Sequence, residues 1–326
     1  MMPVPLKPLF YLIVVLCGLL IPFAFKLRSE GIFACPANGY SENKYLAYCH
    51  VRGYADYDHG AIWFNLEPTV ERHAAEADVL FLGNSKMQFG FSSRVTEEFF
   101  SSAAARYYLL GFSSTENMTF TAPLLSRIRP RARVYVINVD RFFEDRETNI
   151  GNEIIHAGDA IDRTKAKRYW QFVHRPLCST LPVVCGTEAS FFRYRETGSW
   201  EMRGIRNWGA RPVSMAPADE VERWTHFTEL GRQFRAQLPV EDRCLIFTTV
   251  PSAGTKQSEA ATIVRAMGFD LIAPDIDNLM TFDGLHLDSP SAERWSRAFF
   301  EMAGPRIRAC LDQSTVSPVH IMSAGL

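Results

Sequence analysis

The sequence predicts an α/β fold built around a mostly parallel sheet. Short apolar runs that end at turn residues alternate with segments of helical periodicity, and this alternation is typical of βαβ units. Apolar residues make up 47% and charged residues 22% of the 326 residues, the balance of a globular chain that buries a substantial core.

The first strong element is the run DVLFL at 78–82, which ends at Gly83. A short apolar run of this kind fits a strand that is buried on both faces. Further strands are expected over 106–110, 133–139, 244–250 and 269–272. Helices are expected over 70–77, 93–101, 117–127, 221–238, 259–267 and 292–311.

The alternation stops between about 141 and 220, which we interpret as an insertion or cap within an α/β domain of 78–312. Its aromatic residues either stack on a sugar or acyl chain or form a small core of the cap. They are Tyr169, Trp170, Phe191, Phe192, Tyr194, Trp200 and Trp208. Residues 30–77 are expected to form an irregular lead-in, and 313–326 a polar tail.

Residues 9–25 form an uncharged apolar stretch of 17 residues, the shortest length that spans a bilayer as a helix. The following FAFKLRSEG has no small-residue site for signal cleavage. The stretch therefore predicts a membrane anchor within 1–29. A cleaved signal peptide and a buried helix are the alternatives.

Six of the seven cysteines lie outside this stretch, and an even number suits disulfides in an oxidising compartment. The candidates are two pairs that are close in sequence, Cys35 with Cys49 and Cys178 with Cys185. Free buried thiols are the alternative. Disulfides indicate that the body of the protein lies outside the cytoplasm, in the periplasm if the source is a bacterium.

Two distant blocks carry residues suited to nucleophilic catalysis. Ser85 follows Gly83 at the carboxyl end of the first strand, where open α/β sheets bind ligands. Asp283 and His286 stand three apart in a glycine-containing loop before the last helix. In that position Asp283 can hold His286 in one tautomer and leave the other ring nitrogen to a serine hydroxyl. The alternatives are that Ser85 is only part of a turn and that His286 has only a structural role.

With these blocks in this order, the chain resembles the SGNH, or GDSL-type, hydrolase superfamily. The blocks read GNS at 83–85 and DGLH at 283–286, and the run LGNSKMQFGFSS is similar to the membrane-anchored, extracytoplasmic branch that acts on cell-envelope glycans. The resemblance spans about 78–305. It implies a flavodoxin-like, three-layer α/β/α sandwich, with Ser85 as nucleophile, His286 as general base and then acid, and Asp283 as its orienter.

In that family the oxyanion is held by the serine N–H, a glycine N–H of a second block and an asparagine of a third. The second block here is LGFSS, with Gly111 and with Ser114 at the glycine position. The third block puts Asp140 where asparagine is expected, and a carboxylate repels an oxyanion unless it is protonated. Asn138 and Asn117 are the substitutes, so the candidates for the oxyanion hole are Gly111, Ser114 and Asn138.

The resemblance implies an esterase or O-acyltransferase that acts through an acyl-serine on acyl esters, above all acetyl esters, of a cell-envelope or exported polysaccharide. No cofactor and no metal are expected; the expected partners are the glycan, the membrane and a multipass membrane acyltransferase. One alternative is an inactive glycan-binding or assembly protein with the same fold. Another is a metal-dependent phosphatase that uses Asp283, His286 and Asp288. A net charge of −1 argues against a nucleic-acid binder.

Overall fold

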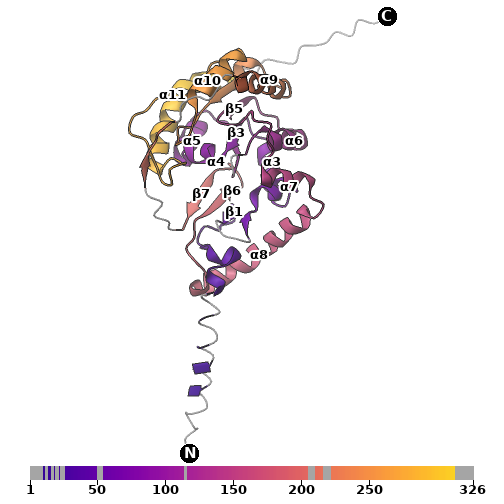
Figure 1. Ribbon diagram of the computed structural model, residues 1–326, viewed down its shortest axis with the longest axis vertical. Coiled ribbons are helices and arrows are strands. Elements are labelled where there is room, and N and C mark those ends of the chain that lie inside the picture. Colours follow the sequence, from indigo (N-terminus) through magenta and orange to yellow (C-terminus); the bar gives the residue numbers. More distant parts are fainter. Residues whose placement is uncertain are drawn as a thin grey trace, which may run out of the picture. The chain divides into compact units, whose positions relative to one another are not determined.

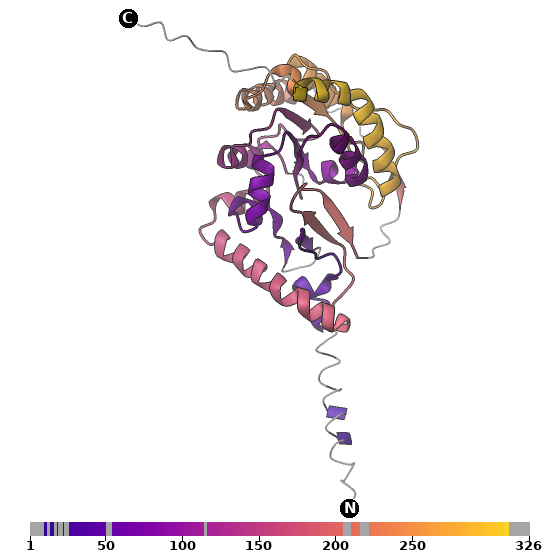
Figure 2. The ribbon, with the colours of Figure 1, turned by 180° about the vertical axis from the view of Figure 1, so that it is seen from behind.

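The computed structural model describes residues 10–11, 14–15, 18, 22, 26–49, 54–113, 116–204, 210–215 and 222–312. The chain divides into two compact units. Figures 1 and 2 show the helices and strands of both from opposite sides. Unit 1 consists of Met1–Pro68, Glu153–Arg195 and Trp200–Asn207. Unit 2 consists of Thr69–Asn152, Glu196–Ser199 and Trp208–Leu326.

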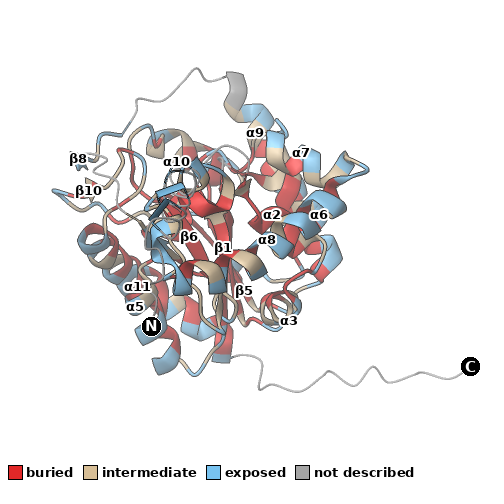
Figure 3. Ribbon diagram, turned by 90° about the horizontal axis from the view of Figure 1, so that it is seen from below, coloured by how far each residue is buried: buried red, intermediate tan, exposed pale blue. Residues whose placement is uncertain are grey.

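Unit 2 contains a parallel sheet of four strands, as the apolar runs predicted. In spatial order they are β4 (Tyr107–Phe112), β3 (Val79–Asn84), β5 (Val134–Asn138) and β9 (Leu245–Thr248). Every residue of the four strands is buried, which explains their continuous apolar sequences (Figure 3). The segment predicted as a fifth strand pairs only through a parallel bridge of Leu271 to Phe247.

Counted along the chain, these strands have the order 2-1-3-4, and the Leu271 bridge extends the sheet on the β9 side. Doubly wound sheets of the flavodoxin type have the order 2-1-3-4-5 and bind ligands between strands 1 and 3. In this chain those two strands are β3 and β5. Their carboxyl ends are therefore the place where a ligand site is expected.

Helices cover both faces of this sheet (Figure 1). On one face, α5 and α11 pack aromatic side chains, including Phe100 and Phe299, against Phe81 and Val136. On the other face, Phe143 contacts both Phe247 of β9 and Phe234 of α9. The helices of unit 2 are α3 (Pro68–Ala75), α4 (Ser85–Gly90), α5 (Ser93–Ser102), α6 (Met118–Ile128), α9 (Glu222–Ala236), α10 (Gln257–Ala266) and α11 (Ser289–Asp312). Helix α7 (Asn149–His156) is divided between the two units. Short elements are η3 (Asp242–Cys244), β8 (Arg211–Pro212) and β10 (Met280–Thr281).

Unit 1 shows that the expectation of an irregular lead-in over 30–77 was wrong. Its antiparallel sheet has the order β2-β1-β6-β7, formed by β2 (Ala55–Asp56), β1 (Lys44–Cys49), β6 (Ser190–Tyr194) and β7 (Trp200–Arg203). The helical elements are η1 (Gly31–Ala34), α2 (Asp58–Trp63), α8 (Ala160–Thr180) and η2 (Pro182–Val184). The lead-in is ordered because β1 pairs with β6, a strand from the stretch interpreted as a cap.

The stretch 141–220 is therefore not one insertion. Residues 153–195 and 200–207 belong to unit 1 with the lead-in, whereas 141–152 and 196–199 belong to unit 2. Its aromatic residues divide as well: Phe191, Phe192 and Trp200 are buried in unit 1, but Tyr169 and Trp170 are exposed. Trp208 lies outside the described residues.

Three disulfides join the six cysteines outside the apolar stretch. Unit 1 contains Cys35–Cys49 and Cys178–Cys185, the two pairs that the sequence singled out. Unit 2 contains Cys244–Cys310, which ties the start of β9 to the end of α11. This third pair was not predicted, because 66 positions separate its cysteines.

Most of the stretch 9–25, on which the anchor was predicted, lies outside the described residues. Within the part of the chain that the structure describes, no helix is both long and apolar enough to cross a membrane.

Candidate active site

Ser85 is the first residue of α4 and directly follows the last residue of β3. The Asn84 side chain caps this helix, because its Oδ1 accepts a hydrogen bond of 3.0 Å from the backbone N–H of Lys86. Gly83 allows β3 and β5 to approach closely, since a Cβ at this position would meet the Cβ of Asn138 at 3.0 Å. Ser85 thus lies half-buried at the carboxyl end of the sheet, where ligands bind in such folds.

Asp283 and His286 occupy a tight loop between β10 and α11. The Asp283 Oδ1 accepts two backbone hydrogen bonds of 2.8 Å, from the N–H groups of Leu285 and His286. Gly284 has a φ of 89°, a left-handed conformation that glycine adopts without strain. These contacts fix the Asp283 carboxylate relative to the imidazole three residues later.

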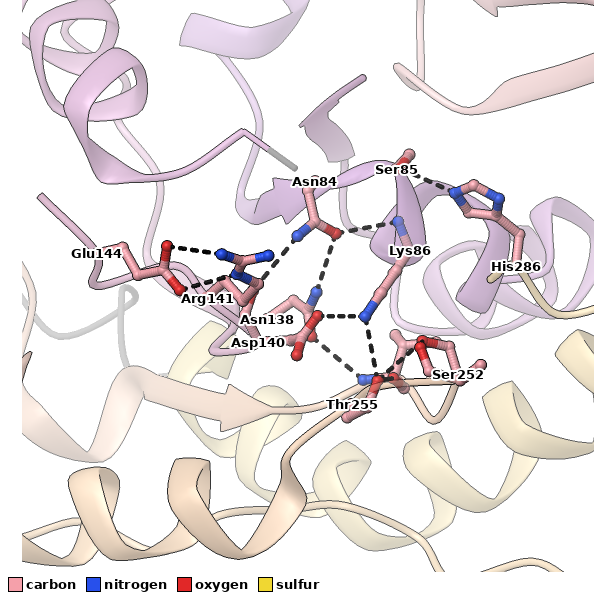
Figure 4. Close-up of polar contacts among 12 residues, drawn as sticks. Asn84, Ser85, Lys86, Asn138, Asp140, Arg141, Glu144, Ser252, Thr255 and His286 are labelled. Carbon is pink, nitrogen blue, oxygen red and sulfur yellow. Dashed lines mark hydrogen bonds and ion pairs between the residues drawn. The ribbon is translucent and has the colours of Figure 1, made fainter. Parts of the chain in front are cut away.

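The structure brings the serine, the histidine and the aspartate into one hydrogen-bonded chain. The Ser85 Oγ lies 2.8 Å from His286 Nε2, although 201 positions separate the two residues (Figure 4). The His286 Nδ1 lies 2.6 Å from Asp283 Oδ2. The neutral imidazole with its proton on Nδ1 satisfies both contacts. Its Nδ1–H group donates to Asp283, and its Nε2 accepts from the Ser85 hydroxyl.

Asp283 is suited to orienting this imidazole as a carboxylate. Burial of Asp283 opposes ionisation, but the hydrogen bond and charge of His286, together with two backbone N–H groups, outweigh it. As a result, the pKa of Asp283 is lowered from its ordinary value of 3.8. An ionised carboxylate at Nδ1 stabilises the imidazolium that forms when Nε2 takes a proton.

Two aromatic rings limit the movement of His286. Phe89 of α4 meets the imidazole edge-to-face at a centroid distance of 4.9 Å. Phe282 stacks on it at 5.6 Å. The imidazole side chain is 15% exposed, so it is shielded from most of the solvent but still open on one side.

Asp140 anchors the residues on both sides of Ser85 (Figure 4). Its carbonyl oxygen accepts a hydrogen bond of 3.3 Å from Asn84 Nδ2. Its carboxylate lies 2.6 Å from Lys86 Nζ, which also lies 3.4 Å from Thr255 Oγ1. The position of the serine is therefore fixed from both sides by one residue at the end of β5.

The same ion pair removes the expected conflict at the third block. A lone carboxylate at Asp140 was expected to repel an oxyanion. Instead the Asp140 side chain is 3% exposed, and its charge is balanced by the ammonium group of Lys86. Lys86 was not among the residues predicted from the sequence, where its place next to the serine was the only available signal.

The three oxyanion candidates have different outcomes. Both groups of the Asn138 amide link strand ends: Nδ2 lies 3.5 Å from Asn84 Oδ1, and Oδ1 accepts a 3.2 Å bond from the Val250 N–H. Gly111 lies in β4 opposite Gly83, and its carbonyl accepts a 3.0 Å bond from Gln88. Ser114 lies outside the described residues.

Two further groups bear on the oxyanion. The substitute Asn117 caps α6, and its Nδ2 donates to the Arg146 carbonyl at 2.8 Å, so its amide is engaged as well. The N–H of Ser85 lies in the first turn of α4, and N–H groups in a first helical turn have no partner within the helix. Of the groups that the sequence suggested, the Ser85 N–H is the donor nearest the chemistry.

A cavity of about 580 Å³ lies beside Asp140, at the carboxyl ends of β5 and β9. Ser85, Asp283 and His286 are not among the residues that line it, so it adjoins their site only through Asp140. Its wall combines ionic groups of both signs with a few apolar residues. Among the ionic groups are Asp140, Arg141, Glu144, Arg146, His226 and Lys256. Such a lining offers many hydrogen-bond donors and acceptors at small net charge, which suits a ligand rich in hydroxyl groups.

The described residues contain one group of side chains close enough to hold a metal, formed by His174, Cys178 and Cys185 in unit 1. The two cysteines are joined to each other, and both nitrogens of His174 already contact protein oxygen atoms. This group therefore does not offer the thiolates that a metal prefers. Asp288, a residue of the phosphatase alternative, accepts a 2.9 Å bond from the Ser291 N–H at the start of α11.

No family model, no curated protein and no solved structure matches this chain.

Proposed function

We propose that the chain is a serine esterase or O-acyltransferase of the SGNH type, in which Ser85 is the nucleophile and His286 the base that Asp283 orients. The observation that carries the proposal is the continuous hydrogen-bonded chain of these residues, with distances of 2.8 and 2.6 Å. The sheet order and the location of Ser85 after β3 support the flavodoxin-like fold that this resemblance implies.

The reaction proceeds in two acyl transfers. His286 Nε2 takes the Ser85 proton while Oγ attacks the ester carbonyl, and the tetrahedral intermediate then expels an alcohol that receives the proton from Nε2. In the second half, His286 Nε2 takes a proton from water or a sugar hydroxyl, whose oxygen attacks the acyl-serine. The tetrahedral intermediate then expels the Ser85 Oγ, which receives the proton from Nε2. Water gives an esterase, and a sugar hydroxyl gives an O-acyltransferase.

The substrate that fits best is an acyl ester of an exported or cell-envelope polysaccharide, above all an acetyl ester. The polar cavity beside Asp140 supports a glycan, and three disulfides support an oxidising compartment. In this proposal residues 9–25 attach the protein to a membrane. The attachment holds the site near a membrane acyl donor, such as a multipass acyltransferase.

Labelling with a fluorophosphonate tests the chemistry. The full chain in detergent is expected to label at Ser85 and to hydrolyse p-nitrophenyl acetate. Ser85→Ala is expected to lose both activities, whereas Ser126→Ala, which removes an exposed serine of α6, keeps both. Folded wild-type protein that neither labels nor turns over the ester overturns the proposal.

The second candidate is an inactive glycan-binding or assembly protein. The observation that favours it is the engagement of the Asn138 amide with Asn84 and Val250, which gives this residue a structural role and leaves at most one of its two Nδ2 hydrogens for an oxyanion. In that case an acetylated polysaccharide binds the wild type and Ser85→Ala equally, and neither protein releases acetate.

A further inference from the structure

An exposed apolar surface runs along α8 and η2 of unit 1. It consists of five large side chains, which we call the aromatic face: Tyr169, Trp170, Phe172, Leu181 and Val183. Their exposed fractions range from 47% for Trp170 to 66% for Phe172. The helical spacing puts Tyr169 between Trp170 and Phe172, so the three rings border the broad exposed side of α8 and do not form one narrow stripe. Several large apolar side chains exposed along one segment favour an interaction site.

Basic residues accompany the aromatic face. Between Arg163 and Thr187 the chain contains no aspartate or glutamate. It contains five cations, which are Arg163, Lys165, Lys167, Arg168 and Arg175. Lys165 and Arg175 are exposed, and the Arg168 guanidinium lies over the ring of Phe172 at 5.7 Å. Arg163 pairs with Glu153 and Asp159, so Lys165 and Arg175 are the cations considered below. Aromatic rings interleaved with exposed cations are typical of a helix that lies at an anionic lipid surface.

The chain that leaves the apolar stretch 9–25 is fixed to the end of α8. The carbonyls of Phe33 and Ala34 accept backbone hydrogen bonds of 2.7 and 2.9 Å from Gly186 and Glu188, just after η2. The ring of Phe33 also meets Trp170 edge-to-face at 6.2 Å. Two disulfides, Cys35–Cys49 and Cys178–Cys185, lock these same segments.

This attachment limits how far the aromatic face can lie from a bilayer that holds 9–25. Eight residues lead from Phe25 to Phe33 (33 − 25 = 8), and a fully extended chain of that length reaches about 29 Å. The path is shorter, because Lys26 to Arg28 are helical and η1 follows. The aromatic face therefore lies within reach of the headgroups on that side.

We infer that the aromatic face rests on the surface of an anionic phospholipid bilayer. Trp170, Tyr169 and Phe172 enter the headgroup region, where amphipathic rings are most stable. Lys165 and Arg175 pair with anionic headgroups, which attract basic side chains near the surface. This inference depends on the membrane attachment proposed above and not on the chemistry at Ser85.

The test measures contact with lipid rather than binding, because the predicted anchor holds the full chain on a vesicle in any orientation of unit 1. The chain is incorporated into vesicles of phosphatidylglycerol and a phosphatidylcholine brominated near the headgroup end of its chains, which quenches nearby tryptophans. The sequence contains six tryptophans, none of them within 9–25. Trp170→Phe is expected to remove at least half of the quenched emission. Trp224→Phe, a half-buried control in α9, is expected to leave it unchanged.

A charge variant tests the lipid chemistry. Lys165→Glu/Arg175→Glu is expected to abolish the extra quenching that phosphatidylglycerol causes over phosphatidylcholine alone. Arg127→Glu/Arg265→Glu, an equal change of charge in unit 2, is expected to keep it. Equal quenching of the wild type and Trp170→Phe overturns the inference. Because Trp170→Phe leaves Ser85 intact, fluorophosphonate labelling reports separately on the proposed chemistry.

Discussion

The Nζ atom of Lys86 lies 2.6 Å from the Oδ2 atom of Asp140, and both side chains are almost completely buried. Removing one partner of a buried ion pair leaves an uncompensated charge and typically costs about 3–5 kcal/mol. We therefore expect Lys86→Met to lower the free energy of unfolding by about that amount. Urea unfolding of the full chain measures the loss.

The double variant separates charge from packing. Because Lys86→Met/Asp140→Asn removes both charges, it is expected to recover at least half of the stability that Lys86→Met loses. Glu229→Gln, which breaks an exposed ion pair with Arg232, is expected to cost less than about 1 kcal/mol. A double variant no more stable than Lys86→Met shows that the side chains do not act as a pair.

Asp283 orients His286, and Asp283→Asn tests this role. An asparagine that offers its N–H to Nδ1 stabilises the wrong imidazole tautomer, so a loss in kcat of about 10³–10⁴ is expected with little change in KM. Ester turnover at saturating and limiting substrate measures both constants. A variant with unchanged kcat removes Asp283 from the mechanism.

The lowered pKa of Asp283 also fixes a sign for its pH dependence. A carboxyl group with a depressed pKa contributes its interactions above the ordinary value of 3.8 and loses them only as pH falls through the lower folded value. The contribution of Asp283 to activity is therefore expected to be constant above about pH 4. The pH–activity profiles of the wild type and Asp283→Asn are compared. If the wild type loses activity above pH 4 and Asp283→Asn does not, this assignment is contradicted.

The sequence predicted the sheet of unit 2 because strands such as β3 are buried on both faces and carry an unbroken apolar run. It failed for unit 1, where β1 reads KYLAYC and finds its partner, β6, far along the chain. β1 is an inner strand between β2 and β6, but its burial does not alternate regularly, so it gives no clear local signal. The short helix α4 was also missed, because its six residues are fewer than periodicity can detect.

The same distinction applies to the site. Ser85, Asp283 and His286 were found because residue type and order carry the chemistry. The buried contacts of Asp140 depend on the register between β3 and β5, which no short pattern encodes. For that reason the sequence suggested an oxyanion role for Asn138 and a conflict at Asp140, whereas both residues support the strand ends.

Asn138→Ala distinguishes an oxyanion donor from a structural residue. Loss of the amide leaves the buried Val250 N–H without its partner, which typically costs about 1–3 kcal/mol. We expect a lower melting temperature but a kcat within about tenfold of the wild type. An oxyanion donor instead costs about 10²–10³ in kcat, so a drop of that size with unchanged melting contradicts the structural role.

His174 makes the stability of unit 1 depend on pH. Its imidazole is fully buried, with Nε2 at 3.0 Å from the Cys35 carbonyl and Nδ1 at 3.2 Å from the Tyr40 hydroxyl. The neutral ring satisfies both contacts, by donating from Nε2 and accepting at Nδ1. Burial outweighs the hydrogen bond to Cys35 and lowers the pKa of His174 from 6.5 to about 4.

Because the folded pKa is depressed, the unfolded chain takes up a proton between pH 6.5 and about 4 that the folded protein does not. Stability is therefore expected to fall by about 3 kcal/mol as pH decreases through this window, and to lose no more from His174 below it. Thermal melting at intervals from pH 4 to 7.5 measures the effect.

His174→Gln keeps a donor toward Cys35 but does not titrate, so its melting temperature is expected to vary less with pH. His226→Gln, an exposed histidine of unit 2, is expected to follow the wild type. Equal pH profiles of His174→Gln and the wild type show that another group causes the dependence.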